Sequence, residues 1–242
     1  HNMNQPMKKS ILFIFLVQSV FLFQCKKPIE KYFDKTIKVD SLNVPLDKNQ
    51  FYFPKEMFPY IDSIQYIPQK DSSYIAKRIY SKDKYDDSVM EWFSEYLFGM
   101  REPLLFNRKV DNEIFRFTWL RSFHEPVVIR ISETKQKYNL NWKTLKLDEN
   151  HKPIEIIINE SKNITKKEWE NFNELVKKAD FWNMELGRYS MGTDGSEWIL
   201  EGVNSENYRA VSVFYPEKGD FYNACDYLIS LTNLKISEKD KY

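Results

Sequence analysis

A regular alternation of apolar and polar side chains in the middle of the chain constrains its fold most strongly. Between residues 114 and 120, aromatic and polar residues occupy alternate positions: Phe115, Phe117 and Trp119 against Arg116 and Thr118. This is the period of a β-strand with one face in a core and the other in water. The same period recurs in three later segments, 127–132, 138–142 and 154–158. We therefore expect a run of antiparallel strands joined by polar loops.

Helix signals flank these strands. In the clearest one, the Thr165 side chain can accept a hydrogen bond from the amide of Glu168, and the Glu168 side chain can reach back to the amide of Thr165. An apolar stripe follows, so a helix is expected to begin here. Two further helices are expected, one from a cap at Asp87 or Ser88 to Gly99 and one from a cap at Asp220.

The expected elements follow the order helix, three or four strands, helix, two strands, helix. The two late strands, 198–203 and 208–215, form a hairpin around the polar turn 204–207. Strands and helices do not alternate as a parallel sheet requires. We therefore expect an α+β fold, in which an antiparallel sheet of about five to six strands packs against two or three helices. Residues 88–242 are interpreted as a single domain with this fold.

The N-terminal segment predicts export. Lys8 and Lys9 precede a mostly apolar run of 14 residues, 11–24. A run of that length is too short to cross a hydrocarbon layer of roughly 30 Å, and it fits the apolar centre of a signal peptide. Residues 1–24 are therefore interpreted as a signal peptide, in which residues 1–6 are an upstream extension before a natural start at Met7.

Cys25 follows the apolar run directly, with Leu22 three residues before it. This arrangement resembles the lipobox of bacterial lipoprotein signal peptides, and the resemblance implies cleavage before Cys25 and acylation of this residue. Phe23 and Gln24 depart from the small residue that the motif has before its cysteine. An uncleaved N-terminal anchor and an incidental core cysteine are the alternatives. We expect an exported protein held on a membrane of the bacterial cell envelope, in a leaflet that the sequence does not specify.

The segment between this anchor and the domain, 25–87, has no sustained period of 2 or 3.6 residues and is interpreted as a tether and an irregular arm. Short apolar pieces at 51–53 and 74–80 can pack on the domain. The chain has 36 Lys and Arg against 35 Asp and Glu, without the clustered basic face of a nucleic-acid binder. We expect a membrane partner through the anchor, a protein partner as a further candidate, and no nucleic acid.

Candidate chemistry is sparse. After Cys25 the histidines are His124 and His151, and no cysteine pair or zinc-protease pattern accompanies them. We therefore expect no metal centre and no other cofactor. One compact polar cluster, formed by Arg121, His124 and Glu125, lies between two expected strands, where it can converge on a ligand. Alternatively, these side chains satisfy one another and the nearby backbone at a corner of the sheet.

Three further residues carry weaker signals. Asp194, in a turn, is a candidate ligand-binding residue together with the polar cluster. Glu201 is a candidate general acid if it is buried and paired with Asp194, and a place on the wet face of the sheet is the alternative. Cys225 lies on the apolar face of the last helix and is interpreted as an inert buried thiol.

Several of these segments together resemble an uncharacterised family of bacterial envelope proteins. The pattern R-x-F-H-x-P occupies residues 121–126, and the pattern D-G-x-x-W-x-L-E-G occupies residues 194–202. The resemblance covers about residues 92–231 and implies an α+β domain without an established activity. Members carry a glycine-rich segment between the early strands, whereas this chain has residues 145–153 there, without glycine.

Three functions are consistent with these features. The leading hypothesis is an envelope lipoprotein whose domain has a binding or structural role. The enzymatic alternative is a small exported hydrolase that uses His124 with Glu125 or Asp194, which requires these side chains to meet in one pocket. The third is an inhibitor or immunity protein that acts on a protein partner through an exposed aromatic patch.

Overall fold

The computed structural model of the chain describes residues 32–70, 74–107, 112–188 and 194–241. Cys25 and the interpreted signal peptide lie outside the described residues. Along the described chain, the elements are η2 (Lys55–Met57), β1 (Pro59–Pro68), β2 (Tyr74–Tyr85), α1 (Asp87–Gly99), β3 (Ile114–Arg121), β4 (His124–Thr134), β5 (Lys137–Leu147), β6 (Pro153–Asn163), α2 (Lys166–Lys178), η3 (Phe181–Asn183), β7 (Gly187–Arg188), β8 (Ser196–Val203), β9 (Tyr208–Phe214), α3 (Asp220–Ser230) and η4 (Glu238–Asp240).

The main sheet has the strand order β6-β5-β4-β3-β8-β9-β7. Its first six strands are antiparallel to their neighbours, and the short β7 lies parallel to β9. The consecutive strands β3 to β6 form a meander, and β8 inserts beside β3. The fold is thus α+β, as predicted. Six antiparallel strands form the main part of this sheet, and three α-helices pack against it.

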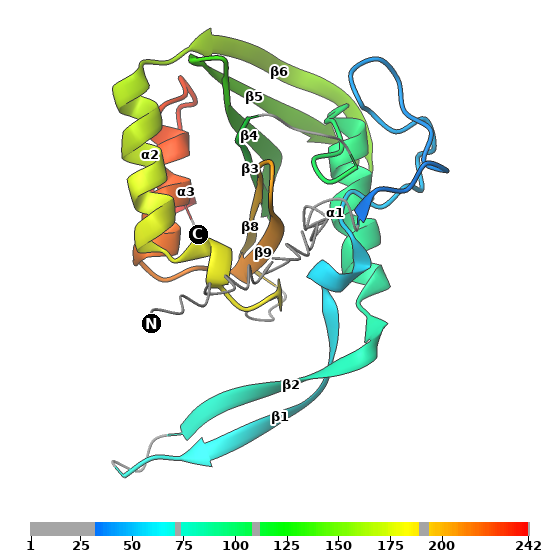
Figure 1. The fold of residues 1–242 in the computed structure, drawn as a ribbon, viewed down its shortest axis with the longest axis vertical. Coiled ribbons are helices and arrows are strands. Elements are labelled where there is room, and N and C mark those ends of the chain that lie inside the picture. Colours follow the sequence, from blue (N-terminus) through cyan, green and yellow to red (C-terminus); the bar gives the residue numbers. More distant parts are fainter. Residues whose placement is uncertain (1–31, 71–73, 108–111, 189–193, 242) are drawn as a thin grey trace, which may run out of the picture.

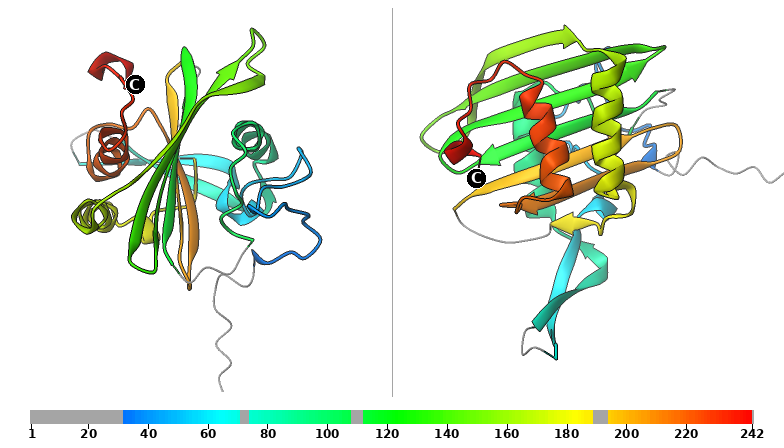
Figure 2. Two further views of the ribbon diagram at one scale, coloured as in Figure 1. Left: turned by 90° about the horizontal axis from the view of Figure 1, so that it is seen from above. Right: turned by 90° about the vertical axis from the view of Figure 1, so that its left-hand side faces the viewer.

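The molecule is built in three layers (Figures 1 and 2). Seen along the sheet in the left view of Figure 2, α2 and α3 cover one face, and α1 with the N-terminal residues covers the other. Two separate apolar cores fill the spaces between the layers. The sheet is therefore buried on both faces, and some charged residues in its central strands are buried as well.

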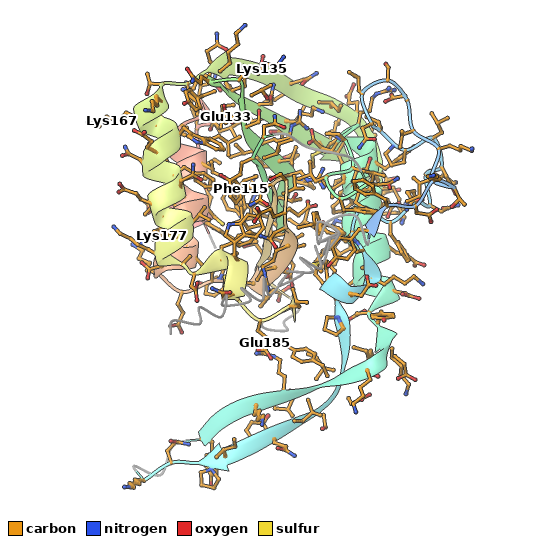
Figure 3. All side chains as sticks on the ribbon, in the orientation of Figure 1. Phe115, Glu133, Lys135, Lys167, Lys177 and Glu185 are labelled. Atoms are coloured by element: carbon orange, nitrogen blue, oxygen red, sulfur yellow. The ribbon has the colours of Figure 1, made fainter. Side chains whose placement is uncertain are left out.

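The first core lies between the sheet and the α2–α3 layer. Phe115 of β3 meets Phe172 of α2 at a centroid distance of 5.2 Å, and Trp198 of β8 stacks on Tyr222 of α3 at 5.0 Å. Figure 3 shows Phe115 between the sheet and the helix, whereas Lys167 lies on the side of α2 that faces away from the sheet. The aromatic alternation that predicts β3 is therefore the set of side chains that fills this core.

Gly202 of β8 allows two of these aromatic rings to approach the sheet. A Cβ atom at this position would lie 2.7 Å from Phe181 Cε1 and 2.8 Å from Phe115 Cε1. Both distances are far below van der Waals contact, so a side chain here would displace the rings. The glycine of the D-G-x-x-W-x-L-E-G pattern thus has a packing role.

The second core lies between the sheet and the α1 layer. Tyr52, Phe53 and Phe58 from the N-terminal residues join Phe93 and Leu97 of α1 in covering this face, and all five are buried. We expected β3 to be wet on one face, and this was wrong, because the α1 layer covers that face. The segment that provides this cover has no regular period, since it packs through irregular turns and the short 3₁₀ helix η2.

The three predicted helix starts can be compared with the structure. Thr165 caps α2, and its side chain and that of Glu168 exchange hydrogen bonds with each other's amides in the predicted reciprocal box. For α1 the cap is Asp86, whose Oδ1 accepts from the amide of Val89 at 3.2 Å, instead of Asp87 or Ser88. Gly219 precedes α3, so Asp220 opens that helix instead of capping it.

Strands β1 and β2 pair antiparallel over a long stretch, here called the β1–β2 hairpin, which projects from the body of the molecule (Figure 1). The sequence of this stretch lacks a strand period for a physical reason. Most of β1 is exposed on both faces, so neither face selects for apolar residues. Among the described residues, no helix combines the length and the apolar character needed to cross a membrane.

Candidate functional site

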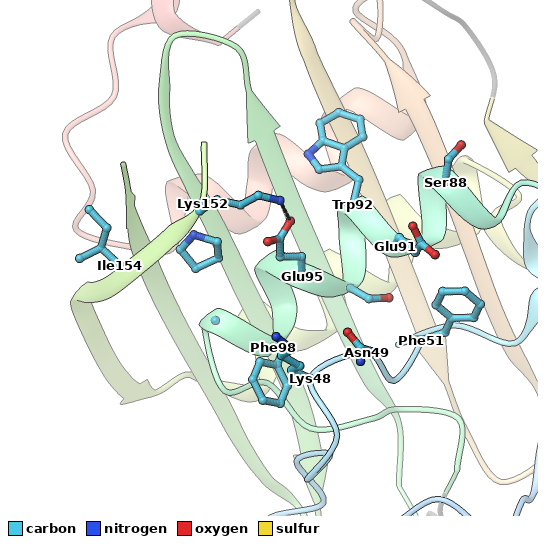
Figure 4. A pocket seen from close by; sticks show the side chains of 13 residues that line it. Lys48, Asn49, Phe51, Ser88, Glu91, Trp92, Glu95, Phe98, Lys152 and Ile154 are labelled. Carbon is cyan, nitrogen blue, oxygen red and sulfur yellow. Dashed lines mark hydrogen bonds and ion pairs between the residues drawn. The ribbon is translucent and has the colours of Figure 1, made fainter. Parts of the chain in front are cut away.

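The outer side of α1 carries a surface groove with a volume of about 960 Å³. Trp92 and Glu95 of α1 form one wall, and Lys152 with Ile154 from the start of β6 forms another. Phe51 and Asn49 of the N-terminal residues close the third side (Figure 4). The groove is thus built from three segments that are distant in the sequence.

The groove combines an aromatic surface with fixed charges. The Trp92 side chain is 36% exposed, and Lys152 Nζ donates to Glu95 Oε2 at 2.9 Å. This hydrogen bond and the charge of Glu95 raise the pKa of the Lys152 ammonium group. An indole face beside a held carboxylate and ammonium can bind a ligand that has an apolar face and polar substituents.

A smaller groove of about 610 Å³ adjoins the first and shares Trp92, Glu95 and Lys152 with it. It runs towards the turn between β3 and β4 and the start of β8. Arg121 and Asp194, two of the predicted site residues, contribute to its lining. The grooves together extend from the N-terminal residues across α1 to the end of the sheet.

The four predicted ligand-binding residues do not share one location. Arg121 and Asp194 line the smaller groove, whereas His124 lies beside the C-terminal residues. Arg121 Nη2 donates to the backbone carbonyl of Glu125 at 2.9 Å, and its guanidinium lies 4.3 Å from the Trp119 ring centroid. This contact is the sheet-corner arrangement that we considered as the alternative. His124 Nε2 lies 3.8 Å from Asp240 in η4, beside the C-terminal residues.

His124 is not among the residues that line either groove, whereas Asp194 lines the smaller one. The structure therefore does not bring these two side chains together in one of these pockets. The form of the hydrolase hypothesis that pairs His124 with Asp194 requires such a meeting. Among the described residues there is also no group of three or more metal-ligating side chains.

A cluster of charged side chains is buried on the α1 side of the sheet, and the sequence analysis did not predict it. Arg116 of β3 and Glu201 of β8 are fully buried, and Arg116 Nε donates to Glu201 Oε2 at 2.6 Å. Tyr208 of β9 donates to the other carboxylate oxygen at 2.8 Å. Glu201 thus pairs with Arg116 and Tyr208, and it neither lies on a wet face nor pairs with Asp194.

The second carboxylate of this buried ionic cluster is Glu102, which follows α1 and is 1% exposed. It accepts from Arg130 of β4, and Lys143 Nζ of β5 lies 2.8 Å from its Oε1. Arg116 connects the two halves, because its Nη1 donates to the backbone carbonyl of Pro103 at 2.7 Å and lies 3.8 Å from Glu102. The cluster therefore fastens the end of α1 to four strands of the sheet.

The two carboxyl groups of the cluster differ electrostatically. Burial acts to raise the pKa of Glu102, but Arg130, Lys143 and Arg116 together outweigh it and hold this pKa below its ordinary value. Burial raises the pKa of Glu201 above its ordinary value, although Arg116 and Tyr208 act in the opposite direction. Each carboxylate has partners, so the cluster is a structural element and not an acid poised towards solvent.

Cys225 has the environment that the sequence predicts. It is a free, fully buried cysteine on α3, and burial raises the pKa of its thiol well above the ordinary value. A thiol in these surroundings stays protonated and is a poor nucleophile.

The chain was compared with known proteins. No protein-family model matches it. A search of curated proteins also gave no match. The resemblance to an uncharacterised envelope family therefore stays a prediction.

The groove residues could not be assigned from the sequence. The sequence predicts a helix that includes Trp92, but it does not predict that Trp92 lies on the outer face of this helix. The other two walls of the groove, residues 48–51 and 152–154, are loops and strand ends without a motif. The buried cluster had one sequence signal, the placement of Arg116 and Glu201 between large apolar residues in their strands. That signal fits an exposed face equally well unless the second cover of the sheet is known.

Proposed function

We propose that this chain is an exported lipoprotein of the bacterial cell envelope, anchored to a membrane by acylated Cys25, and that its α+β domain is a binding module. The anchor is supported by the apolar run that ends at Cys25. The binding role is carried by one observation, the groove along α1 with the exposed Trp92 ring beside the Glu95–Lys152 pair. A concave surface that combines an aromatic ring with a few oriented polar groups is the common form of a ligand site.

Acyl labelling tests the anchor. Cells that express the wild-type chain should incorporate a labelled fatty acid into it, and Cys25→Ser should abolish the label and release the protein from the membrane fraction. Cys225→Ala is the matched control, because Cys225 is buried and should not affect labelling. Equal labelling of wild type and Cys25→Ser would reject the anchor.

Thermal unfolding in the presence of envelope saccharides, peptides and lipids tests the groove. A ligand at 100 times its Kd should stabilise the wild type by about 2.7 kcal/mol, which raises Tm by roughly 5–10 °C in a domain of this size. Trp92→Ala should lose most of this shift. Tyr215→Ala is the control, because Tyr215 is 56% exposed and lies outside both grooves. If a ligand stabilises Trp92→Ala as strongly as the wild type, the ligand binds outside this groove and the proposal is wrong.

A further inference from the structure

The β1–β2 hairpin carries exposed apolar side chains far from both cores. Tyr66 and Tyr74 are 66% and 65% exposed, and Ile64 is 40% exposed. Figures 1 and 2 show the hairpin extending away from the three layers, with no other element along its outer part. An isolated pair of strands is only marginally stable in water. A hairpin of this length that also exposes tyrosines therefore presents a surface suited to contact with a membrane or with another protein.

The strand register places these side chains on one face. Residues two apart in a strand share a face, so Ile64, Tyr66 and Pro68 point the same way. Pro68 lies directly opposite Tyr74 in the register of the hairpin, which puts Tyr74 on that face as well. We call this set, Ile64, Tyr66, Pro68 and Tyr74, the tyrosine strip.

The hairpin carries a net positive charge, whereas the domain that follows it is acidic. Residues 59–85 contain five Lys or Arg against three Asp, a net charge of +2, whereas residues 86–242 contain 22 Lys or Arg against 27 Asp or Glu, a net charge of −5. The exposed Lys70, Lys77, Lys82 and Lys84 form no ion pair with any residue that the structure describes. Lys77 lies opposite Gln65 and therefore on the other face of the hairpin, so the lysines flank the tyrosine strip instead of belonging to it. A narrow hairpin with tyrosines flanked by lysines complements anionic headgroups, with rings at the interface and cations on phosphates.

The base of the hairpin packs in the same core as the first described residues after the proposed anchor. Tyr32 packs in the α1-side core, with its ring 5.8 Å from that of Tyr208, and Phe58 at the start of the hairpin belongs to the same core. Seven residue steps separate Cys25 from Tyr32, so the two lie at most about 25 Å apart. A strand of ten residues spans about 33 Å. A bilayer that holds Cys25 is therefore within reach of the tyrosine strip.

We propose that the β1–β2 hairpin binds the surface of an anionic bilayer, with the tyrosine strip in the headgroup region and its lysines on the lipid phosphates. The proposed anchor at Cys25 decides which membrane the hairpin contacts. The binding of the hairpin to an anionic bilayer does not depend on that anchor. The hairpin is then a second attachment, which orients the domain on the membrane that Cys25 fastens it to.

Vesicle binding tests this inference without the lipid anchor. The mature chain, residues 25–242 with Cys25→Ser, contains every residue that the structure describes and carries no acyl group. It should sediment with vesicles of phosphatidylglycerol and phosphatidylcholine in equal parts, and only weakly with phosphatidylcholine alone. Raising the salt concentration should release it. In this chain, Tyr66→Ser with Tyr74→Ser should weaken binding by about tenfold or more, and so should Lys70→Glu with Lys77→Glu.

Tyr215→Ser serves as the matched control, since Tyr215 is exposed but lies outside the hairpin. It should bind as the parent does, and circular dichroism should show the same fold for all variants. Absence of binding to anionic vesicles, or equal binding by the parent and the tyrosine variant, overturns the inference. Hairpin-dependent dimers in sedimentation without vesicles would assign the strip to a second copy and also overturn it.

The two proposals fail separately. Vesicle binding through the hairpin together with an unlabelled Cys25 would reject the anchor and leave the hairpin inference standing. A labelled Cys25 with no hairpin-dependent binding would do the reverse. A purified protein that binds the tyrosine strip in place of vesicles would indicate the inhibitor or immunity function considered from the sequence, and would contradict the membrane role.

Discussion

Replacing Arg116 with alanine should lower the free energy of unfolding by about 3–5 kcal/mol. The guanidinium is fully buried and connects Glu201 with Glu102, so its removal leaves Glu201 with only the Tyr208 hydroxyl as a described donor. It also removes the donor to the Pro103 carbonyl. A buried carboxylate that loses its cation incurs a desolvation penalty that nothing compensates. Urea unfolding followed by tryptophan fluorescence measures the change.

Two variants make this expectation specific to the buried cluster. Arg101→Ala also removes an arginine from an ion pair, but Arg101 is 68% exposed and lies 3.4 Å from Asp40 at the surface. It should change stability by at most about 1 kcal/mol. Arg116→Met combined with Glu201→Leu should recover part of the loss, because it leaves neither charge alone. A cost for Arg116→Ala no larger than that for Arg101→Ala would contradict the role assigned to the cluster.

Replacing Trp198 with alanine should also lower the free energy of unfolding by about 3–5 kcal/mol. The Trp198 ring is fully buried in the core beneath α3, where it stacks on Tyr222 and lies 5.1 Å from Phe117. Its Nε1 donates to Ser196 Oγ at 2.9 Å, so the indole is also anchored through its polar atom. Removing it leaves a cavity between the sheet and α3 that the rigid strands cannot close.

Trp92→Ala is the matched control for size and chemistry, because the Trp92 ring lies partly exposed on α1. Thermal and urea unfolding should show a change of about 1 kcal/mol or less for this variant. If the two tryptophan variants unfold alike, the α2–α3 core would not be the main source of stability of the sheet.

The sequence could predict the elements whose residues repeat with a regular period. The alternation around Phe115 identifies β3, and the reciprocal box at Thr165 and Glu168 identifies α2, because each signal lies within a few neighbouring residues. The order of these elements was enough for the α+β class and the antiparallel sheet. The strand ends were less accurate, since β5 runs on to Leu147 and β6 to Asn163, beyond their apolar parts.

The features that the sequence did not predict depend on contacts between distant segments. Arg116 alternates with aromatic residues as an exposed residue would, and only the cover formed by α1 and residues 32–58 buries it. That cover consists of short irregular pieces such as Tyr52 and Phe53, which have no period to detect. The candidate groove has the same origin, because Trp92, Lys152 and Phe51 meet only once α1 is docked.

The buried ionic cluster also determines how α1 can sit on the sheet. Apolar burial is not directional, so by itself it specifies the position of a helix on a sheet less sharply than paired charges do. Glu102 lies three residues after the end of α1 and fits between Arg130 and Lys143, and the Pro103 carbonyl accepts from Arg116. A shift of α1 by one turn, about 5.4 Å, would leave these buried charges without partners. The cluster thus selects one register for the α1 layer, and that register assembles the three walls of the groove.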